Sequence, residues 1–357
     1  MNLNVYKHRM FLKRILIKNG FPIHLIWFVT ARCNLSCSHC FYHDQISFTK
    51  QELTIDEIKA VIESLSPLLS LSLTGGEPFL REDLPDIAEL IYLKRLTENL
   101  LLYTNGFNTN SILLNTEKIL TRCPGLNISI NVSIDGFEKE HDQYRNKIGA
   151  YAKTITTIKE LQRLKRKFPN FQVFVNTTLQ KENQHYINEL RRDIFSRLGI
   201  NSGFTIIRGN PLNPALLDVE AEIYKSIIKT IQAEMQCSHR ISLIQKIVNT
   251  RIRLGNELAY NTYISKRRTY DCYAGSLMGV IHETGDVRPC EMLDDSLMGN
   301  LRDYDYKIGN IWKSIKAEEI RKRIKTKRCF CTYECQYTCN TLYNIKYLPI
   351  FIKDMIL

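Results

Sequence analysis

The sequence lacks the features that mark membrane-spanning and secreted proteins. No apolar run approaches the length of a transmembrane helix. The first 22 residues mix Lys and Arg among apolar positions and contain no signal peptide that we recognise. Long repeats, low-complexity tracts and Gly/Ser linkers are absent too. We therefore expect a globular, cytoplasmic protein.

Acidic residues are fewer than basic ones, with 37 Asp and Glu against 49 Lys and Arg and a net charge of +12. This balance favours anionic partners, among them nucleic acid, phosphorylated metabolites, acidic peptides and membrane surfaces. Charge alone does not choose among them. The apolar fraction of 44% is ordinary for a globular protein, and 357 residues are enough for a catalytic domain and a smaller one.

Short apolar, β-branched runs alternate with helical stretches from residue 23 onward. Six of these runs predict strands, at residues 23–30, 69–73, 99–103, 126–134, 173–178 and 203–207. The alternation predicts an α/β fold with a parallel sheet, a partial (β/α)6 TIM-like barrel that is open on one side. Because ligands of such folds bind at the carboxyl ends of the strands, we expect the site there.

The remaining chain divides into four expected regions. Residues 1–22 read as a basic amphipathic helix that packs on its own domain, with weak membrane-surface contact as an alternative. The barrel occupies residues 23–211, and residues 212–264 form a helical connection. A small cysteine-rich domain is expected over residues 265–345, followed by a tail at 346–357.

Three of the 11 cysteines follow the first predicted strand. Cys33, Cys37 and Cys40 have the spacing C-x3-C-x2-C. In a reducing compartment, clustered cysteines usually bind metal. Three thiolates can hold three corners of a 4Fe–4S cluster and leave one iron open to a chelating ligand. Zinc is the alternative, with His39 or His43 as a further ligand.

This cysteine loop resembles the signature of the radical S-adenosylmethionine (SAM) superfamily, and further motifs extend the resemblance over about residues 23–211. Each motif falls at or just after the end of a predicted strand. The motifs are Thr74-Gly75-Gly76-Glu77-Pro78, Val132-Ser133-Ile134-Asp135-Gly136 with His141-Asp142 and Arg145, and Arg208-Gly209-Asn210-Pro211.

The resemblance implies two cofactors, a 4Fe–4S cluster and SAM, and assigns residues to SAM. Gly75, Gly76 and Glu77 would meet its amino group, Ser133, Asp135 and Arg145 its ribose and carboxylate, and His39 would lie beside adenine. It also implies that the cluster, reduced by a protein such as flavodoxin or ferredoxin, cleaves SAM to a 5′-deoxyadenosyl radical. That radical abstracts a substrate hydrogen atom.

A second cysteine group begins with Cys272, Gly285 and Cys290 in the spacing C-x12-G-x4-C, which reads as a hairpin that delivers a thiol. It continues with Cys329, Cys331, Cys335 and Cys339. The group resembles the SPASM and twitch domains that hold auxiliary iron–sulfur clusters.

Six cysteines cannot supply two four-cysteine clusters, so we expect one auxiliary 4Fe–4S cluster. Its ligands would be Cys272, Cys290 and two of the last four cysteines, with Cys331 and Cys335 favoured. A structural zinc ribbon is the alternative. Cys123 and Cys237 lie outside both groups and are expected to be buried small apolar residues.

The substrate is not readable from the sequence. The resemblance implies oxidation, epimerisation or crosslinking of a peptide or a sugar-type small molecule. Because the barrel begins near residue 23, we expect no added peptide-recognition domain. The alternatives are an RNA-modifying radical SAM enzyme, although no RNA-binding module is present, and a non-catalytic iron–sulfur or zinc protein.

A basic run at residues 321–328 reads as a solvated helix face, with docking of an acidic electron donor or an anionic substrate as the alternative. No residue stands out as a catalytic base.

Overall fold

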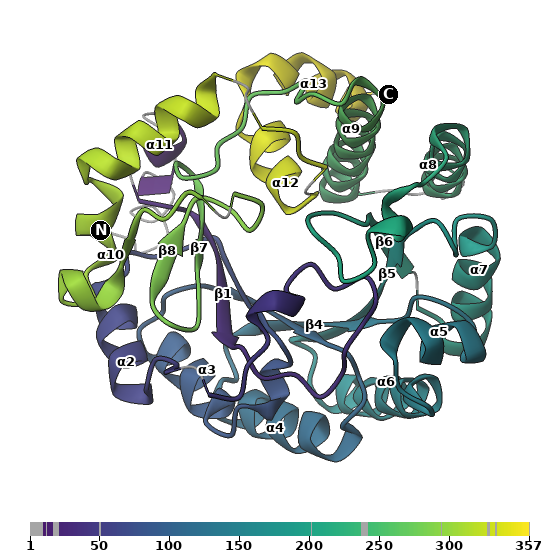
Figure 1. Ribbon diagram of the computed structural model, residues 1–357, viewed down its shortest axis with the longest axis horizontal. Helices are drawn as coiled ribbons and strands as arrows, with labels where there is room; N and C mark the ends of the chain where they lie inside the picture. Colours follow the sequence, from purple (N-terminus) through teal and green to yellow (C-terminus); the bar gives the residue numbers. More distant parts are fainter. Residues whose placement is uncertain are drawn as a thin grey trace.

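The structure is a computed structural model that describes residues 10–11, 13–16, 21–49, 51–200, 202–236, 242–293, 295–326, 329–332 and 334–356. Its centre is a sheet in the order β6-β5-β4-β3-β2-β1-β7-β8-β9. Strands β1 to β6 run parallel, and helices cover their outer face (Figure 1).

The parallel strands confirm the predicted partial barrel. They are β1 (His24–Thr30), β2 (Ser70–Gly75), β3 (Asn99–Thr104), β4 (Asn127–Ser133), β5 (Phe171–Leu179) and β6 (Ser202–Ile206). In the described sheet the free edge of β1 pairs with β7 rather than with β6, so the barrel does not close.

The helices that cover this sheet follow the strands in sequence. They are α2 (Ile55–Ser64), α3 (Leu84–Leu93), α4 (Thr109–Arg122), α5 (Glu138–Arg145), α6 (Ala150–Lys167) and α7 (Ile187–Leu198). Helix α2 shows how the sequence sets these boundaries. Thr54 and Glu57 form a capping box at its start, and Ile58, Val61 and Ile62 form its buried face.

The C-terminal part continues the barrel sheet. Strand β7 (Met278–Ile281) runs parallel to β1, and β8 (Asp286–Arg288) and β9 (Gly299–Asn300) extend it antiparallel. Gly285 turns the β7–β8 hairpin with φ +91°, which confirms the predicted hairpin before Cys290. One hydrophobic core joins this hairpin to the barrel, so the two parts share a sheet and a core.

Helices form most of the remaining chain. The predicted helical connection contains α8 (Ala221–Gln236) and α9 (Leu243–Ser265). Further on lie α10 (Ile308–Trp312), α11 (Ile315–Lys325), α12 (Glu334–Leu342) and α13 (Leu348–Ile356), the last within the predicted tail. Short 3-10 helices lie at His43–Gln45, Pro78–Leu80, Pro214–Leu217, Leu301–Tyr304 and Ile345–Tyr347.

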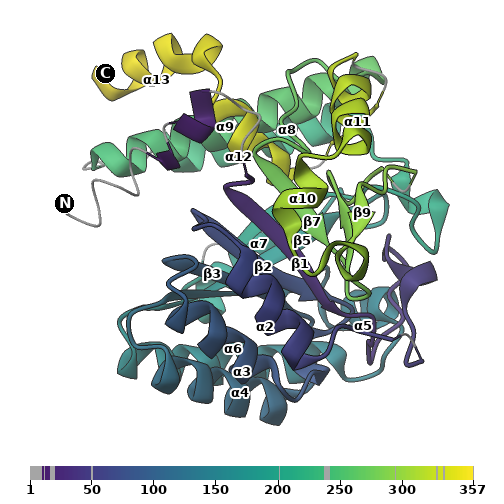
Figure 2. The ribbon, with the colours of Figure 1, turned by 90° about the vertical axis from the view of Figure 1, so that its left-hand side faces the viewer.

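The C-terminal helix α13 lies on the side of the molecule away from the loops that follow the barrel strands (Figure 2). Of the helix predicted at residues 1–22, the described residues 10, 11 and 13–16 are helical. The remainder up to residue 20 lies outside the described residues. No helix in the described part of the chain is long and apolar enough to span a bilayer.

Candidate active site

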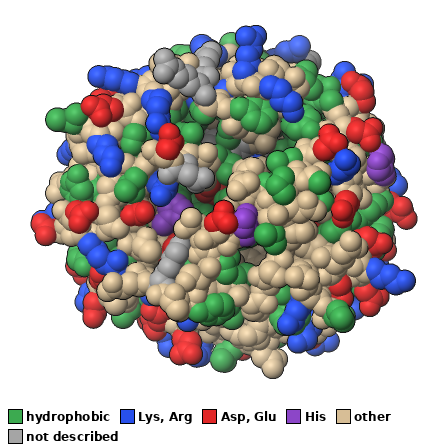
Figure 3. Space-filling model, viewed as in Figure 1, with side chains coloured by type: hydrophobic (Ala, Val, Ile, Leu, Met, Phe, Trp, Pro, Cys, Tyr) green, Lys and Arg blue, Asp and Glu red, His purple; other side chains and the backbone are tan. Residues whose placement is uncertain are grey.

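The carboxyl ends of the barrel strands line a cavity of about 610 Å³, where the topology predicts the site. The cysteine loop after β1 forms one wall, and residues from β2 to β6 form the floor. Figure 3 shows that this face is hollowed near its centre, where histidine side chains gather. The three cysteines of the loop, Cys33, Cys37 and Cys40, all line the cavity.

The cysteine loop is held from two sides. The amide of Asn105, just after β3, donates to Asn34 Oδ1 at 2.9 Å. From the α5 side, Ser38 N donates to the Tyr144 carbonyl at 2.9 Å, and Asn146 Nδ2 donates to Ser36 Oγ at 3.0 Å. These hydrogen bonds fix the position of the loop and so of its three thiols.

Burial raises the pKa of the Cys33 thiol to about 12 and that of the Cys40 thiol to about 11, and the neighbouring thiols add to both shifts. The pKa of Cys37 is raised as well. Thiols bind metal as thiolates, so a cationic group in this position would lower these pKa values and favour the bound form. Among the residues that the structure describes, no three His, Cys, Asp or Glu side chains are grouped to hold a single metal ion. The loop fits a cluster because its three thiols, one buried and two half-buried, face one cavity, and because Cys37 lies close enough to raise the pKa of the other two.

A buried charged network lies beside this loop. Asp135 accepts a hydrogen bond from Arg145 and from Thr178 N at 2.7 Å, and lies 3.4 Å from His39 Nε2. Arg145 also donates to Cys37 Sγ at 3.5 Å. Burial alone would raise the pKa of Asp135, but Arg145 and two histidines hold it at about 2, so the carboxylate stays charged.

Two buried nitrogens of this network, Arg145 Nε and His39 Nδ1, have no hydrogen-bond partner among the described residues. Burial lowers the pKa of His39 to about 4, so its ring is neutral at pH 7. Arg145, His39 and Ser133 all line the cavity. Five of the predicted SAM residues therefore line one cavity, while Asp135 is fully buried and outside its lining. Buried unpaired nitrogens fit a polar ligand.

Gly75 and Gly76 line the cavity, but the close approach that requires glycine there is to protein backbone. A Cβ on Gly75 would lie 2.2 Å from the Thr30 carbonyl oxygen, and one on Gly76 would lie 2.2 Å from that of Arg32. These glycines let the end of β2 pack against the start of the cysteine loop.

Glu77 lies beneath the site rather than in its lining. Its carboxylate accepts hydrogen bonds from Thr104 Oγ1 at 2.9 Å and from Asn105 N at 2.7 Å. Burial raises the pKa of Glu77 to about 7. The side chain therefore ties the end of β2 to the end of β3.

Sequence reasoning missed several polar residues of the cavity. Asn131 on β4 and Asn176 and Thr178 on β5 line it together with Thr205 on β6. The available signal was the alternation of polar and apolar residues along β4 (NISINVS), since every second residue of a strand faces the same side.

Four cysteines come together in the C-terminal part. Burial raises the pKa of Cys290, and the thiols of Cys331, Cys272 and Cys329 contribute to the shift. The pKa of Cys272 is raised by burial and in part by Cys329. Arg268, which is buried, donates to Cys329 Sγ at 3.0 Å. This grouping of thiols beside one guanidinium fits an anionic metal–thiolate cluster.

The other cysteines lie elsewhere. Cys339 is buried in α12, where it contributes to the raised pKa of Tyr343. Cys123 is fully buried in the core, as predicted. Cys237 and the side chain of Cys335 lie outside the described residues.

One ion pair joins the two parts of the chain at the cavity wall. Arg208, just after β6, lies 3.3 Å from Glu291, which follows Cys290. Its guanidinium lies 5.1 Å from the centre of the Phe41 ring. Both charged residues line the cavity, with side chains 17% and 6% exposed.

The fold and site define a class of enzyme, one with a partial α/β barrel and a three-cysteine loop over the carboxyl ends of its strands. The family model of the radical SAM superfamily matches residues 27–194, and that of the SPASM iron–sulfur cluster-binding domain matches residues 272–339. The chain belongs to the radical SAM superfamily and carries a C-terminal SPASM domain. Its cofactors are SAM and 4Fe–4S clusters.

Known proteins resemble this chain over most of its length. An AdoMet-dependent heme synthase of Methanosarcina barkeri is 30% identical over 88% of this chain and 89% of its own length. The sporulation killing factor maturation protein SkfB of Bacillus subtilis is 24% identical over 87% of this chain and 69% of its own. The fold matches that of anSMEcpe with bound AdoMet and Cp18Cys peptide, at a TM-score of 0.61 and 18% identity, covering 94% of this chain and 99% of that one.

Proposed function

We propose that the protein is a radical SAM oxidase of a substrate that carries a carboxylate, and that a tetrapyrrole on the route to heme is the first candidate. The Arg208–Glu291 pair carries this proposal. A guanidinium has five N–H donors in a planar fork, so Arg208 can bind a substrate carboxylate in addition to, or in place of, Glu291.

Different residues of the chain would bind the cluster and SAM. A 4Fe–4S cluster on Cys33, Cys37 and Cys40 would supply the electron that breaks the sulfonium bond of SAM. Asp135 is fully buried and outside the cavity lining, so it would hold Arg145 in position, while Ser133 and the unpaired nitrogen of Arg145 would contact polar groups of SAM.

One auxiliary cluster would accept the second electron of an oxidation. We propose Cys272, Cys290, Cys329 and Cys331 as its ligands, because the thiols of Cys331, Cys272 and Cys329 lie close enough to Cys290 to add to the rise of its pKa on burial. Cys331 was favoured from the sequence, and Cys329 replaces Cys335 as its companion. Arg208 pairs with the residue that follows Cys290, so a substrate held there would lie between the two cluster sites.

Two observations favour a tetrapyrrole. The heme synthase relative matches along nearly the whole chain. The cavity is also lined by apolar side chains, which suit a flat apolar ring. They include Phe28, Leu35, Phe41, Ile46, Ile206, Ile207 and Leu212. A peptide is the second candidate, since SkfB is a maturation protein and the matching anSMEcpe structure holds a peptide.

The test uses an iron porphyrin with free propionates and its methyl ester, with binding followed by the Soret band. We expect the acid to bind at least about tenfold more tightly than the ester, because the ester loses a charge-assisted hydrogen bond. Arg208→Gln should remove this preference, and the exposed Arg163→Gln should keep it.

Equal binding of acid and ester to the unaltered protein would contradict the carboxylate proposal. Peptide-stimulated formation of 5′-deoxyadenosine, with no porphyrin binding, would favour the second candidate.

A further inference from the structure

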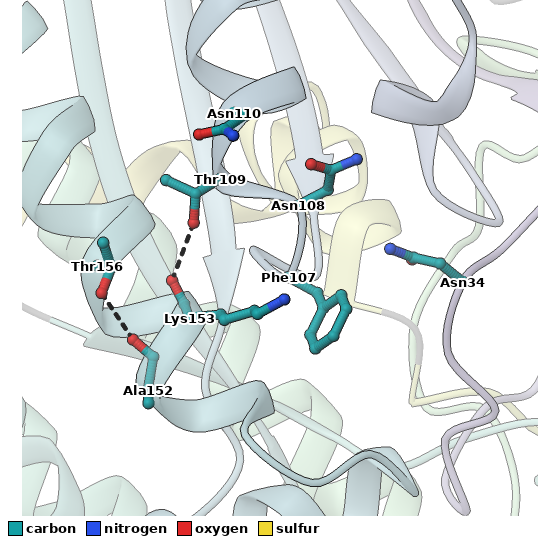
Figure 4. A pocket seen from close by; sticks show the side chains of 8 residues that line it. All are labelled: Asn34, Phe107, Asn108, Thr109, Asn110, Ala152, Lys153 and Thr156. Carbon is teal, nitrogen blue, oxygen red and sulfur yellow. Dashed lines mark hydrogen bonds between the residues drawn. The ribbon is translucent and has the colours of Figure 1, made fainter.

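A second cavity, of about 550 Å³, lies on the outer side of the cysteine loop (Figure 4). Asn34, which follows Cys33, reaches it from the loop, while the start of α4 and the first turns of α6 supply the rest. No carboxylate is present among the eight residues that line it, which are Asn34, Phe107, Asn108, Thr109, Asn110, Ala152, Lys153 and Thr156.

Two lysines lie over the aromatic ring at this cavity. The ammonium of Lys153 is 4.3 Å from the centre of the Phe107 ring, and that of Lys147 is 5.4 Å away. Both lysines are exposed. The carboxylate of Asp142 is turned inward, where it accepts from Gly149 N at 2.5 Å and Tyr151 N at 2.8 Å. At this cavity, the two ammonium groups therefore face solvent while the Asp142 carboxylate does not.

An isoleucine stands out beside these lysines. Ile148 is 95% exposed, in the turn between α5 and α6. A single exposed apolar side chain is ordinary on a protein surface, so Ile148 adds apolar contact area beside the lysines and does not mark a site by itself. We call Asn34, Phe107, Lys147, Ile148 and Lys153 the loop-side surface.

The loop-side surface is tied to the cysteine loop at two points. Asn105 donates from Nδ2 to Asn34 Oδ1 at 2.9 Å, and its own Oδ1 accepts from Phe107 N at 2.9 Å. Asn146, next to Lys147, donates to Ser36 Oγ at 3.0 Å. A partner on this surface would therefore lie against the segment that separates Cys33 from Cys37.

We propose that the loop-side surface docks a small acidic one-electron carrier protein, which rests on the radical SAM function of this chain. The reduced carrier loses one electron and the cluster on the cysteine loop gains it. The carrier then leaves in its oxidised form. Lys147 and Lys153 attract the acidic rim of the carrier, and Ile148 makes the apolar contact. Electron-transfer complexes have small interfaces, below about 1,200 Å², which a surface of this extent can provide.

The basic run at residues 321–328 suits this role less well. The guanidinium of Arg321 is buried and donates to the carbonyls of Gly275 and Trp312 at 3.1 and 3.0 Å. Arg323 makes two hydrogen bonds of 3.0 Å to Asp295. These arginines hold α11 in the fold, and α11 lies across the molecule from α5 and α6 (Figure 1).

The experiment compares the reconstituted full-length enzyme with a Lys147→Glu, Lys153→Glu double variant, and uses flavodoxin as the probe. Binding of dye-labelled oxidised flavodoxin, measured by fluorescence anisotropy without SAM, should weaken about tenfold in the variant. Binding to the unaltered enzyme should also weaken between about 0.05 and 0.3 M salt. Ile148→Ser should weaken it at both salt levels. Lys159→Glu, an exposed lysine further along α6, is the matched control and should bind as the unaltered enzyme does.

The second measurement is the rate of SAM cleavage, followed as formation of 5′-deoxyadenosine. With reduced flavodoxin, the double variant should form 5′-deoxyadenosine with a higher KM for the carrier. With dithionite, a small reductant that needs no docking, its rate should be unchanged.

Unchanged flavodoxin affinity in the double variant would overturn the proposal, as would an equal loss in Lys159→Glu or an equal fall with dithionite. Tighter binding of an RNA oligonucleotide that displaces flavodoxin would also overturn it, in favour of a nucleic-acid surface. A complete lack of 5′-deoxyadenosine from the unaltered enzyme with dithionite would instead refute the radical SAM function itself.

Discussion

The two cysteine groups of this protein are built in opposite ways. Cys33, Cys37 and Cys40 lie within eight residues of one loop, beside the buried Asp135–Arg145 pair. The C-terminal thiols come from three separate places in the chain, and the β7–β8 hairpin and the segment before α12 bring them together. A contiguous loop can be recognised by its spacing, whereas an assembled site depends on the whole fold.

The difference also concerns charge. Cys37 has a guanidinium and a carboxylate beside it. Burial and three neighbouring thiols raise the pKa of Cys290, and the one guanidinium described at that site, from Arg268, donates to Cys329. The first site therefore suits a polar ligand beside its thiols, whereas the second consists mainly of thiols. Each can be removed without direct damage to the other.

The triple variant Cys33→Ala, Cys37→Ala, Cys40→Ala has the largest expected effect. It should abolish SAM cleavage and lower the iron content from about eight to about four per chain, because only the auxiliary cluster remains. Anaerobic reconstitution, with iron and sulfide analysis and chromatographic detection of 5′-deoxyadenosine, measures both. Undiminished 5′-deoxyadenosine would refute the assignment of the first site, and one zinc in place of the remaining irons would refute the auxiliary cluster.

Gly76→Ala should be nearly as damaging to the first site while sparing the second. The added Cβ would meet backbone atoms of Arg32 at 2.2 and 2.6 Å, so the cysteine loop must shift. We expect a loss of about 1–3 kcal/mol in stability and at least about a tenfold fall in SAM cleavage, with the auxiliary irons retained. Gly203→Ala is the control, since its Cβ would make only an ordinary contact at 3.5 Å. Equal stability and equal SAM cleavage in the two variants would show that the cysteine loop tolerates displacement.

Cys329→Ala and Cys335→Ala separate the ligand set supported by the structure from the one favoured by the sequence. The first should lose the auxiliary irons and melt roughly 5–10 °C lower, because small metal domains depend on their metal for folding. Cys335→Ala should keep both the auxiliary irons and the melting temperature of the unaltered protein. Differential scanning fluorimetry and iron analysis decide, and the reverse pattern would restore Cys335 as the ligand.

The sequence predicted the six parallel strands, the hairpin before Cys290 and the motif residues at the strand ends. Those features are local, since period-two alternation, a glycine turn and short spacings can be read within one segment. It did not reveal that Glu77 ties β2 to β3, or that Gly75 and Gly76 are needed for backbone packing. It also missed the pairing of Arg208 with Glu291. These contacts join segments that only the fold brings together.

The smallest expected effect concerns Glu57, which joins the barrel to the C-terminal part through hydrogen bonds that need no metal. Glu57 in the first turn of α2 accepts hydrogen bonds from Arg302 Nε at 2.7 Å and from Tyr306 Oη at 2.8 Å. Its side chain is 16% exposed. The hydrogen bonds from Arg302, more than any other contact, lower the pKa of Glu57 to about 2.

Because the folded pKa lies below the ordinary value of about 4.5, the ionised Glu57 stabilises the fold at neutral pH. That stability is lost as the pH falls from about 4.5 toward 2. Glu57→Gln should therefore lower the free energy of unfolding by about 1–2 kcal/mol at pH 7, with partial solvent exposure limiting the value. The difference in free energy of unfolding between the variant and the unaltered protein should narrow below about pH 4.5.

Glutamine keeps the capping box with Thr54, so helix α2 itself stays capped. Asp56→Asn, exposed in the same turn, is the control, and urea unfolding at several pH values is the measurement. If the difference in free energy of unfolding between Glu57→Gln and the unaltered protein stays constant with pH, the contact acts through packing rather than charge.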